Sequence, residues 1–155
     1  MISRTSESLE KAKNYSFLLL KFRSRSEYEI RQRLKLKKFD EPTIRATLSF
    51  LKEKSLIDDE AFAQAWFDFR LKRPFGLRRI TQELRIKGIG KDILARVLEK
   101  TKENYSEREI VAKIAKERLN RLKGIEPETL KRRLFAYLLR RGFSSEAIID
   151  ALEQL

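Results

Sequence analysis

The feature that most constrains this chain is a phrase that occurs three times. In each copy an amphipathic helix ends at a basic residue and a tight turn, and a second amphipathic helix follows. The copies run from Ile30 through Lys37 to Leu48, from Ile80 through Lys87 to Leu98, and from Leu134 through Arg141 to Leu152. Because one such unit cannot bury its apolar face alone, the copies have to stack. The repeat therefore predicts an elongated array of helices rather than a compact body around a catalytic pocket.

Helix signals fill the remainder of the chain and predict an all-α fold of about nine helices. Ser26 and Glu29 form a capping-box pattern at one helix start, and Asp40 with Pro42 marks the next. We expect three tandem three-helix repeats at residues 1–57, 58–102 and 103–155, with no linker that would separate independent domains.

Turns and aromatic residues add two expectations. Gly88 and Gly142 stand where a helix ends in a left-handed residue, and Lys38 takes the matching place in the first repeat. The order helix, glycine turn, helix is also typical of DNA-binding helix-turn-helix motifs, but ordinary packing of helices is favoured.

Three aromatic residues share one stripe of a helix and are predicted to be core: Phe62, Trp66 and Phe69. Phe67 leaves that stripe and would pack on a neighbouring repeat or stack on a base.

Composition excludes several classes of chemistry. The chain has no Cys and no His, which argues against disulfides, common zinc sites, thiol nucleophiles and Ser-His triads. No glycine-rich phosphate loop is present. The acidic run Asp58, Asp59 and Glu60 precedes a helix and is interpreted as its cap rather than as a magnesium or catalytic site. We therefore expect no enzyme activity and no cofactor.

Charge indicates a polyanionic partner. The chain has a net charge of +13, and no apolar run resembles a signal peptide or a membrane span, so a cytoplasmic monomer is expected. The candidate binding residues are basic side chains in all three repeats: Arg23, Arg25, Arg70, Lys72, Arg73, Arg78, Arg79, Lys87, Arg132, Arg133, Arg140 and Arg141.

Some of these charges could also serve the fold without any partner. Arg79 could pair with Glu83, four residues on, in a solvated loop. Arg70 would then also be exposed, and neither arginine would contribute much to the stability of the fold. Lys87 and Arg141 could serve only to complement the negative ends of their helices. Both possibilities stay open at the level of the sequence.

The central third of the chain resembles a known family. From Asp58 to Ile89 it reads DDEAFAQAWFDFRLKRPFGLRRITQELRIKGI, which is similar to the RecX family of regulators of the bacterial RecA recombinase. The first copy also matches the family pattern, and the third matches more loosely. Two departures are Lys38 and the pair Lys54-Ser55, where the family would have glycine at the turn.

The resemblance implies a binding protein with a curved array of three-helix repeats. Such a protein would lie in the groove of a RecA filament on single- or double-stranded DNA and lower its ATPase, strand-exchange and coprotease activities in DNA repair, recombination and the SOS response. The alternative is a sequence-independent DNA-binding protein that acts without the recombinase.

Overall fold

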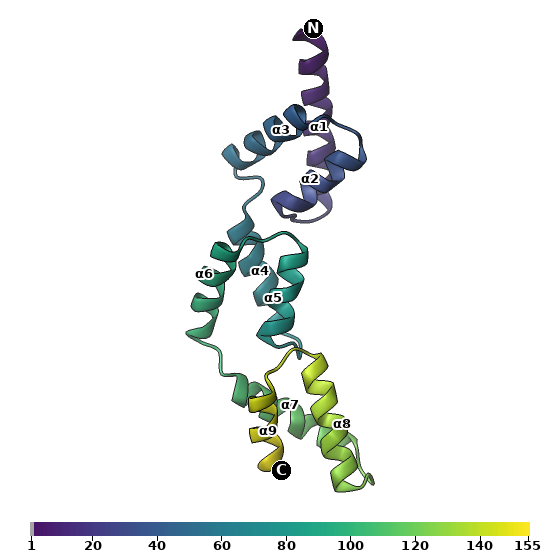
Figure 1. Cartoon of the computed structure of the whole chain (residues 1–155), viewed down its shortest axis with the longest axis vertical. Helices are drawn as coiled ribbons and strands as arrows, with labels where there is room; N and C mark the ends of the chain where they lie inside the picture. The colour runs from purple at the N-terminus through teal and green to yellow at the C-terminus, as the bar shows by residue number, and fades with distance from the viewer. Residues whose placement is uncertain (1) are drawn as a thin grey trace. The chain divides into compact units, whose positions relative to one another are not determined.

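A computed structural model describes residues 2–155, and every regular element in that range is an α-helix. The helices are α1 (Ile2–Phe22), α2 (Glu27–Leu36), α3 (Glu41–Glu53), α4 (Asp59–Leu71), α5 (Leu77–Ile86), α6 (Lys91–Lys102), α7 (Glu107–Arg121), α8 (Pro127–Arg140) and α9 (Ser145–Glu153), as Figure 1 shows. Across the same residues, none of the helices combines the length and the apolar character that a bilayer crossing requires. The predicted all-α class and the nine helices are therefore confirmed for the described residues.

Helix starts follow the capping signals of the sequence. At α2 the Ser26 hydroxyl accepts the Glu29 N–H, and the Glu29 carboxylate accepts the Ser26 N–H in return, which is the complete capping box. Asp40 accepts the Thr43 N–H at α3. Pro127 is the first residue of α8, where its missing N–H costs nothing.

The chain divides into two compact units. Unit 1 comprises Met1–Gln64 and Leu84–Leu94, and unit 2 comprises Ala65–Glu83 and Ala95–Leu155. In unit 1, α1 and α3 pack together around a core that includes Leu19, Leu34 and Leu48. In unit 2, α7 packs on α9 around Val111 and Ile148. The repeat boundaries after residues 57 and 102 stay a prediction.

The aromatic residues of α4 correct one expectation. Phe62 is buried as predicted, but Phe69 is half exposed and Trp66 only partly buried. Phe67 is instead completely buried, so packing rather than base stacking explains it. The buried face of α4 contains Phe62, Ala63 and Phe67, so it is rotated relative to the predicted stripe of Phe62, Trp66 and Phe69.

Left-handed residues occur at the predicted turns. Gly88 and Gly142 have φ values of +79° and +90°, and Lys38 has +63°. Ser55, the second position that lacks an expected glycine, has φ +55°. The backbone of the first repeat therefore keeps the turn conformation although its sequence departs from glycine.

Candidate functional site

Two backbone junctions organise the basic residues, and we name them the first and second joints. The first joint lies in unit 1 and consists of Ser26, Tyr28, Glu29, Lys87 and Gly88. The Ser26 hydroxyl is completely buried and donates to the Lys87 carbonyl over 2.6 Å. A Cβ on Gly88 would lie 2.9 Å from Cδ1 of Tyr28 and closer still to its Cβ. The backbone of the turn after α5 therefore packs directly against the side chains of Ser26 and Tyr28 at the start of α2.

The second joint lies in unit 2 and consists of Gly76, Arg79 and residues 140–142. The Gly76 N–H donates to the Arg141 carbonyl over 2.8 Å, and the Arg79 guanidinium donates to the Arg140 carbonyl over 3.3 Å. A Cβ on Gly142 would lie 2.6 Å from the backbone nitrogen of Arg79. The turn after α8 thus packs on the start of α5, just as the turn after α5 packs on the start of α2 in the first joint.

Glu83 gathers three donors beside the second joint. Its carboxylate accepts a two-pronged hydrogen bond from Arg70, an N–H from the Trp66 indole over 2.9 Å, and a weaker contact from Arg79 over 3.4 Å. Burial raises the pKa of Glu83, but the hydrogen bonds from Arg70 and Trp66 outweigh it and bring the pKa below its usual value. These groups hold α4 against α5.

Of the alternatives left open for Arg70, the structure excludes a solvated surface residue. Only 14% of its side chain is exposed, and its guanidinium carbon lies 3.8 Å from the centroid of the Phe75 ring. The predicted pair between Arg79 and Glu83 does form, but Arg70 takes the better geometry. Arg70 therefore has a structural role, because its partner is a carboxylate of the same chain.

Glu29 has the corresponding role at the first joint. It accepts two hydrogen bonds from Arg23, at 2.9 and 3.1 Å, and lies 3.2 Å from the Lys87 ammonium. Burial raises the pKa of Glu29, whereas the bonds from Arg23 and the Ser26 N–H lower it further, so the net shift is downward. Arg23 and Lys87 thus meet a carboxylate of their own chain.

Arg25 and Arg141 are also engaged within the chain. Nε of Arg25 donates to the Leu19 carbonyl over 3.3 Å, and burial lowers its pKa, with the nearby Arg23 adding to the effect. Arg141 lies over the Phe75 and Tyr137 rings, 4.8 and 5.0 Å from their centroids. Both side chains stabilise local packing.

Six of the predicted binding residues are exposed and form no ion pair within residues 2–155: Lys72, Arg73, Arg78, Arg132, Arg133 and Arg140. All six belong to unit 2. Arg133 and Arg140 are seven residues apart, two helical turns, and so share one face of α8. The structure therefore divides the predicted set into cations that hold the joints and cations that face solvent.

The acidic run at the start of α4 serves as caps. Asp58 accepts the N–H groups of Glu60 and Ala61 at 3.0 and 3.1 Å, as expected for an N-cap. Asp59 accepts the Glu27 N–H over 2.9 Å at the start of α2. Burial is the main cause of a raised pKa at Asp59. Within the described residues no cluster of side chains is suited to a metal ion.

Sequence reasoning missed the carboxylates that organise the joints. It assigned Glu29 only to a capping box, and Glu83 only to a helical pair with Arg79. A signal was present in the spacing, since Ser26 and Gly76 stand at matching repeat positions, as do Lys87 and Arg141. Ser26 and Lys87 bridge the first joint, and Gly76 and Arg141 bridge the second.

Comparisons with known proteins agree with this repeat. Three family models match: the first three-helix domain of RecX at residues 12–51, the second at 58–98 and the third at 93–152. Regulatory protein RecX of Amycolatopsis mediterranei is 34% identical over 139 residues, which is 88% of this chain and 78% of that protein. The RecX of Caldanaerobacter subterraneus subsp. tengcongensis is 32% identical over 143 residues, covering 92% and 70%.

Solved structures show the same fold. The crystal structure of RecX from Lactobacillus salivarius superposes with a TM-score of 0.83 over 97% of both chains at 21% identity. Another crystal structure of a regulatory protein RecX gives a TM-score of 0.83 at 24% identity, over 98% of this chain and 76% of that one. From the three matched domains and the curated relatives, the chain belongs to the RecX family of regulatory proteins.

Proposed function

We propose that this protein binds the filament of RecA on DNA and inhibits its ATPase, strand-exchange and coprotease activities during DNA repair and recombination. The observation that carries the proposal is the set of solvent-facing cations in unit 2, in a chain of the RecX family with a net charge of +13. Arginine suits this task because its planar group binds phosphate or carboxylate with two parallel hydrogen bonds. The protein acts by binding, without a chemical step, in the bacterial cytoplasm and as a monomer.

The contact residues that we propose are the exposed cations without a carboxylate partner in the described chain. Arg78 on α5 and Arg132, Arg133 and Arg140 on α8 form the first set. Lys72 and Arg73, in the segment before α5, are the other two. Arg23, Arg25, Arg70, Arg79, Lys87 and Arg141 serve mainly to hold the fold. Arg23, Arg70, Arg79 and Lys87 contact Glu29 or Glu83, so part of their charge is already neutralised and they contribute less to a partner. Arg25 and Arg141 are instead held by a backbone carbonyl and by aromatic rings.

The test is DNA-stimulated ATP hydrolysis by the recombinase with this protein titrated in. We expect inhibition by the parent, and loss of filament affinity of about tenfold, or about 1.4 kcal/mol, when Arg78, Arg132, Arg133 and Arg140 are changed together to Gln. The matched control changes four other exposed cations to Gln: Arg45, Lys91, Lys100 and Lys102. An absence of inhibition by the parent at every ratio would refute the proposal.

The second candidate is a sequence-independent DNA-binding protein that acts without the recombinase, which the net charge of +13 favours. It predicts tight binding to free duplex DNA, with the logarithm of affinity falling by about 0.9 per neutralised phosphate against the logarithm of salt concentration. Filament sedimentation separates the two functions. If naked DNA is bound tightly and recombinase-coated DNA is ignored, the second function is correct.

A further inference from the structure

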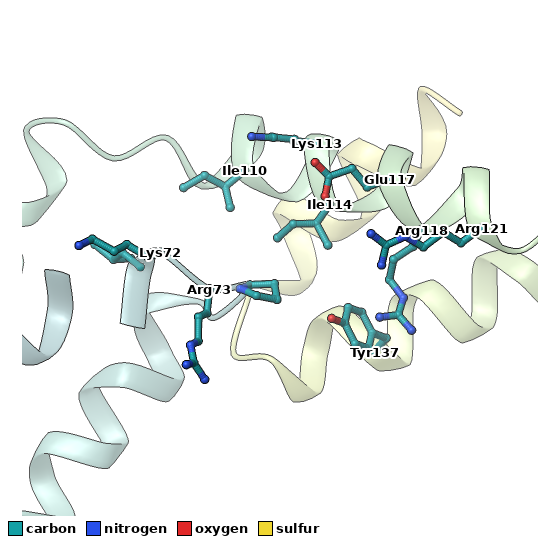
Figure 2. Close-up of a pocket in the computed structure, with 11 residues that line it drawn as sticks. Lys72, Arg73, Ile110, Lys113, Ile114, Glu117, Arg118, Arg121 and Tyr137 are labelled. Carbon is teal, nitrogen blue, oxygen red and sulfur yellow. The ribbon is translucent and has the colours of Figure 1, made fainter. Parts of the chain in front are cut away.

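A hollow of about 420 Å³ in unit 2 lies among α7, α8 and the segment that follows α4. Its apolar lining consists of Leu71, Pro74, Ile110, Ile114 and Tyr137. Figure 2 shows Ile110 and Ile114 projecting from α7 toward the side where the Tyr137 ring lies. The volume is within the range of sites that bind a small ligand or a large side chain.

The rim of this hollow is strongly basic. Five cations line it, namely Lys72, Arg73, Lys113, Arg118 and Arg121, against one carboxylate, Glu117. None of the five forms an ion pair in the part of the chain that the structure describes. Four of them stay exposed, and like charges gathered around an apolar surface repel one another. An anionic partner would relieve this repulsion, so charge complementarity indicates what the hollow binds.

The aromatic residue of the hollow argues against a nucleotide base as its occupant. The guanidinium carbon of Arg118 lies 3.7 Å from the centroid of the Tyr137 ring, and that of Arg141 lies 5.0 Å from it. Base recognition in single strands uses open aromatic faces for stacking. Tyr137 already has guanidinium groups over its ring, so a base would have to displace one. Apolar contact with Ile110 and Ile114 is what the hollow still offers.

We propose that the hollow binds an acidic peptide segment of a partner protein, with one large apolar side chain seated between α7 and α8. The carboxylates that flank this side chain would contact the rim, chiefly Lys113 and Arg121. Recognition of acidic segments by clustered cations is a recurrent mode of peptide binding. The proposal does not rest on the recombinase function, because the direct titration with the peptide contains neither recombinase nor DNA.

The experiment measures fluorescence anisotropy of a short labelled peptide, in which Glu residues flank one central Phe, against the full-length protein. We expect Lys113→Gln with Arg121→Gln to weaken binding by roughly fivefold or more, since two charge contacts are lost. The matched control is Lys116→Gln with Lys123→Gln, which removes the same charge outside the hollow and should bind like the parent. Gln preserves helix propensity, so all variants should fold.

Two probes test the apolar part of the proposal. Replacing the Phe of the peptide with Ser should weaken binding clearly, because the hollow then receives no apolar group. A single-stranded oligonucleotide of equal charge should compete poorly. Equal binding by the Lys113/Arg121 variant and its control, equal binding of the Ser peptide, or stronger binding of the oligonucleotide would each overturn the proposal.

Discussion

The two joints bring equivalent elements together with different chemistry. In the first, a serine hydroxyl donates to the Lys87 carbonyl. In the second, the backbone N–H of Gly76 donates to the Arg141 carbonyl. Glu29 collects the charges around the first joint and Glu83 those beside the second. What the joints share is a left-handed glycine, Gly88 or Gly142, pressed against the start of an earlier helix.

The close packing of the glycine turn against an earlier helix is therefore common to both joints, whereas the hydrogen-bond donor differs between them. Either a hydroxyl or an N–H can satisfy the carbonyl, because both donate one hydrogen bond of similar strength. A side chain at the glycine cannot be accommodated, because it would overlap the neighbouring helix. The turn at Lys38 supports this view, since the Lys38 side chain is exposed rather than pressed against an earlier helix.

The largest expected effect is that of Gly142→Ala. We expect it to lower the free energy of unfolding by about 3 kcal/mol, because a left-handed alanine is strained and its Cβ would also overlap the backbone of Arg79. Urea denaturation followed by circular dichroism measures the change.

The control for this change is Gly124→Ala. Gly124 also has a left-handed backbone, with φ +81°, but among the described residues, its two chain neighbours aside, nothing lies within 4 Å of the place that an alanine Cβ would take. Only the conformational cost of about 1 kcal/mol should therefore appear. If the two variants lost the same stability, the close approach at the second joint would have no energetic importance.

Next in size is Ser26→Ala at the first joint. The change removes the cap of α2 and takes the buried Ser26 hydroxyl donor away from the Lys87 carbonyl, so we expect a loss of about 2 kcal/mol. Ser106→Ala removes only a cap, at α7, and should cost about 1 kcal/mol or less. Thermal unfolding of both variants gives the difference, and a larger loss at Ser106 would contradict the role of the Ser26 bridge.

A third prediction concerns pH and the carboxylate beside the second joint. The folded pKa of Glu83 lies below its unfolded value, which is about 4.3. Its contribution to stability is therefore complete above that unfolded pKa and is lost as pH falls through the folded pKa. We expect Glu83→Gln to lower the unfolding free energy by about 1–2 kcal/mol at neutral pH and to have a smaller effect in acid.

Denaturant titrations at neutral and acid pH measure this difference. Glu117→Gln is the matched control, because Glu117 is exposed and forms no ion pair in the described chain, so its curve should follow the parent. An effect of Glu83→Gln that stays constant with pH would show that the charge of the carboxylate is not what stabilises the joint.

The smallest expected effect is that of Lys38→Gly. Glycine relieves the strain of φ +63° but gains freedom in the unfolded chain, and these effects nearly cancel, so the change in stability should be within about 1 kcal/mol. The reverse exchange, Gly88→Lys, should cost far more because Tyr28 occupies the space. Equilibrium urea denaturation of the two variants gives the change in unfolding free energy of each. Similar losses in both variants would contradict the difference between the exposed turn at Lys38 and the packed turn at Gly88.

Helices, caps and turns could be predicted from the sequence because their causes are local. Ser26 and Asp40 mark helix starts through hydrogen bonds to residues three positions away. Pro127 marks another start because the first residue of a helix does not need its N–H. Glycine at residues 88 and 142 indicates a left-handed turn, because a Cβ is disfavoured there. The threefold spacing gave the number of elements, since each copy repeats the same local signals.

The side-chain assignments could not be predicted to the same extent. Phe67 rather than Phe69 enters the core, and a helical stripe cannot distinguish these two faces when alanine occupies part of each. Arg70 could equally have been a solvated cation. Its engagement depends on Glu83, thirteen residues away on another helix.

By itself, then, the sequence determined an all-α chain of three repeats with a basic excess, because helix periodicity, capping and charge are properties of neighbouring residues. Only the tertiary structure decided which cations are committed to the fold and which remain available to a partner. Ion pairing depends on distances between groups on different helices, and a cation held at hydrogen-bond distance from a carboxylate has part of its charge neutralised. Lys87 and Arg140 are both basic residues near helix ends, yet one contacts Glu29 and the other faces solvent.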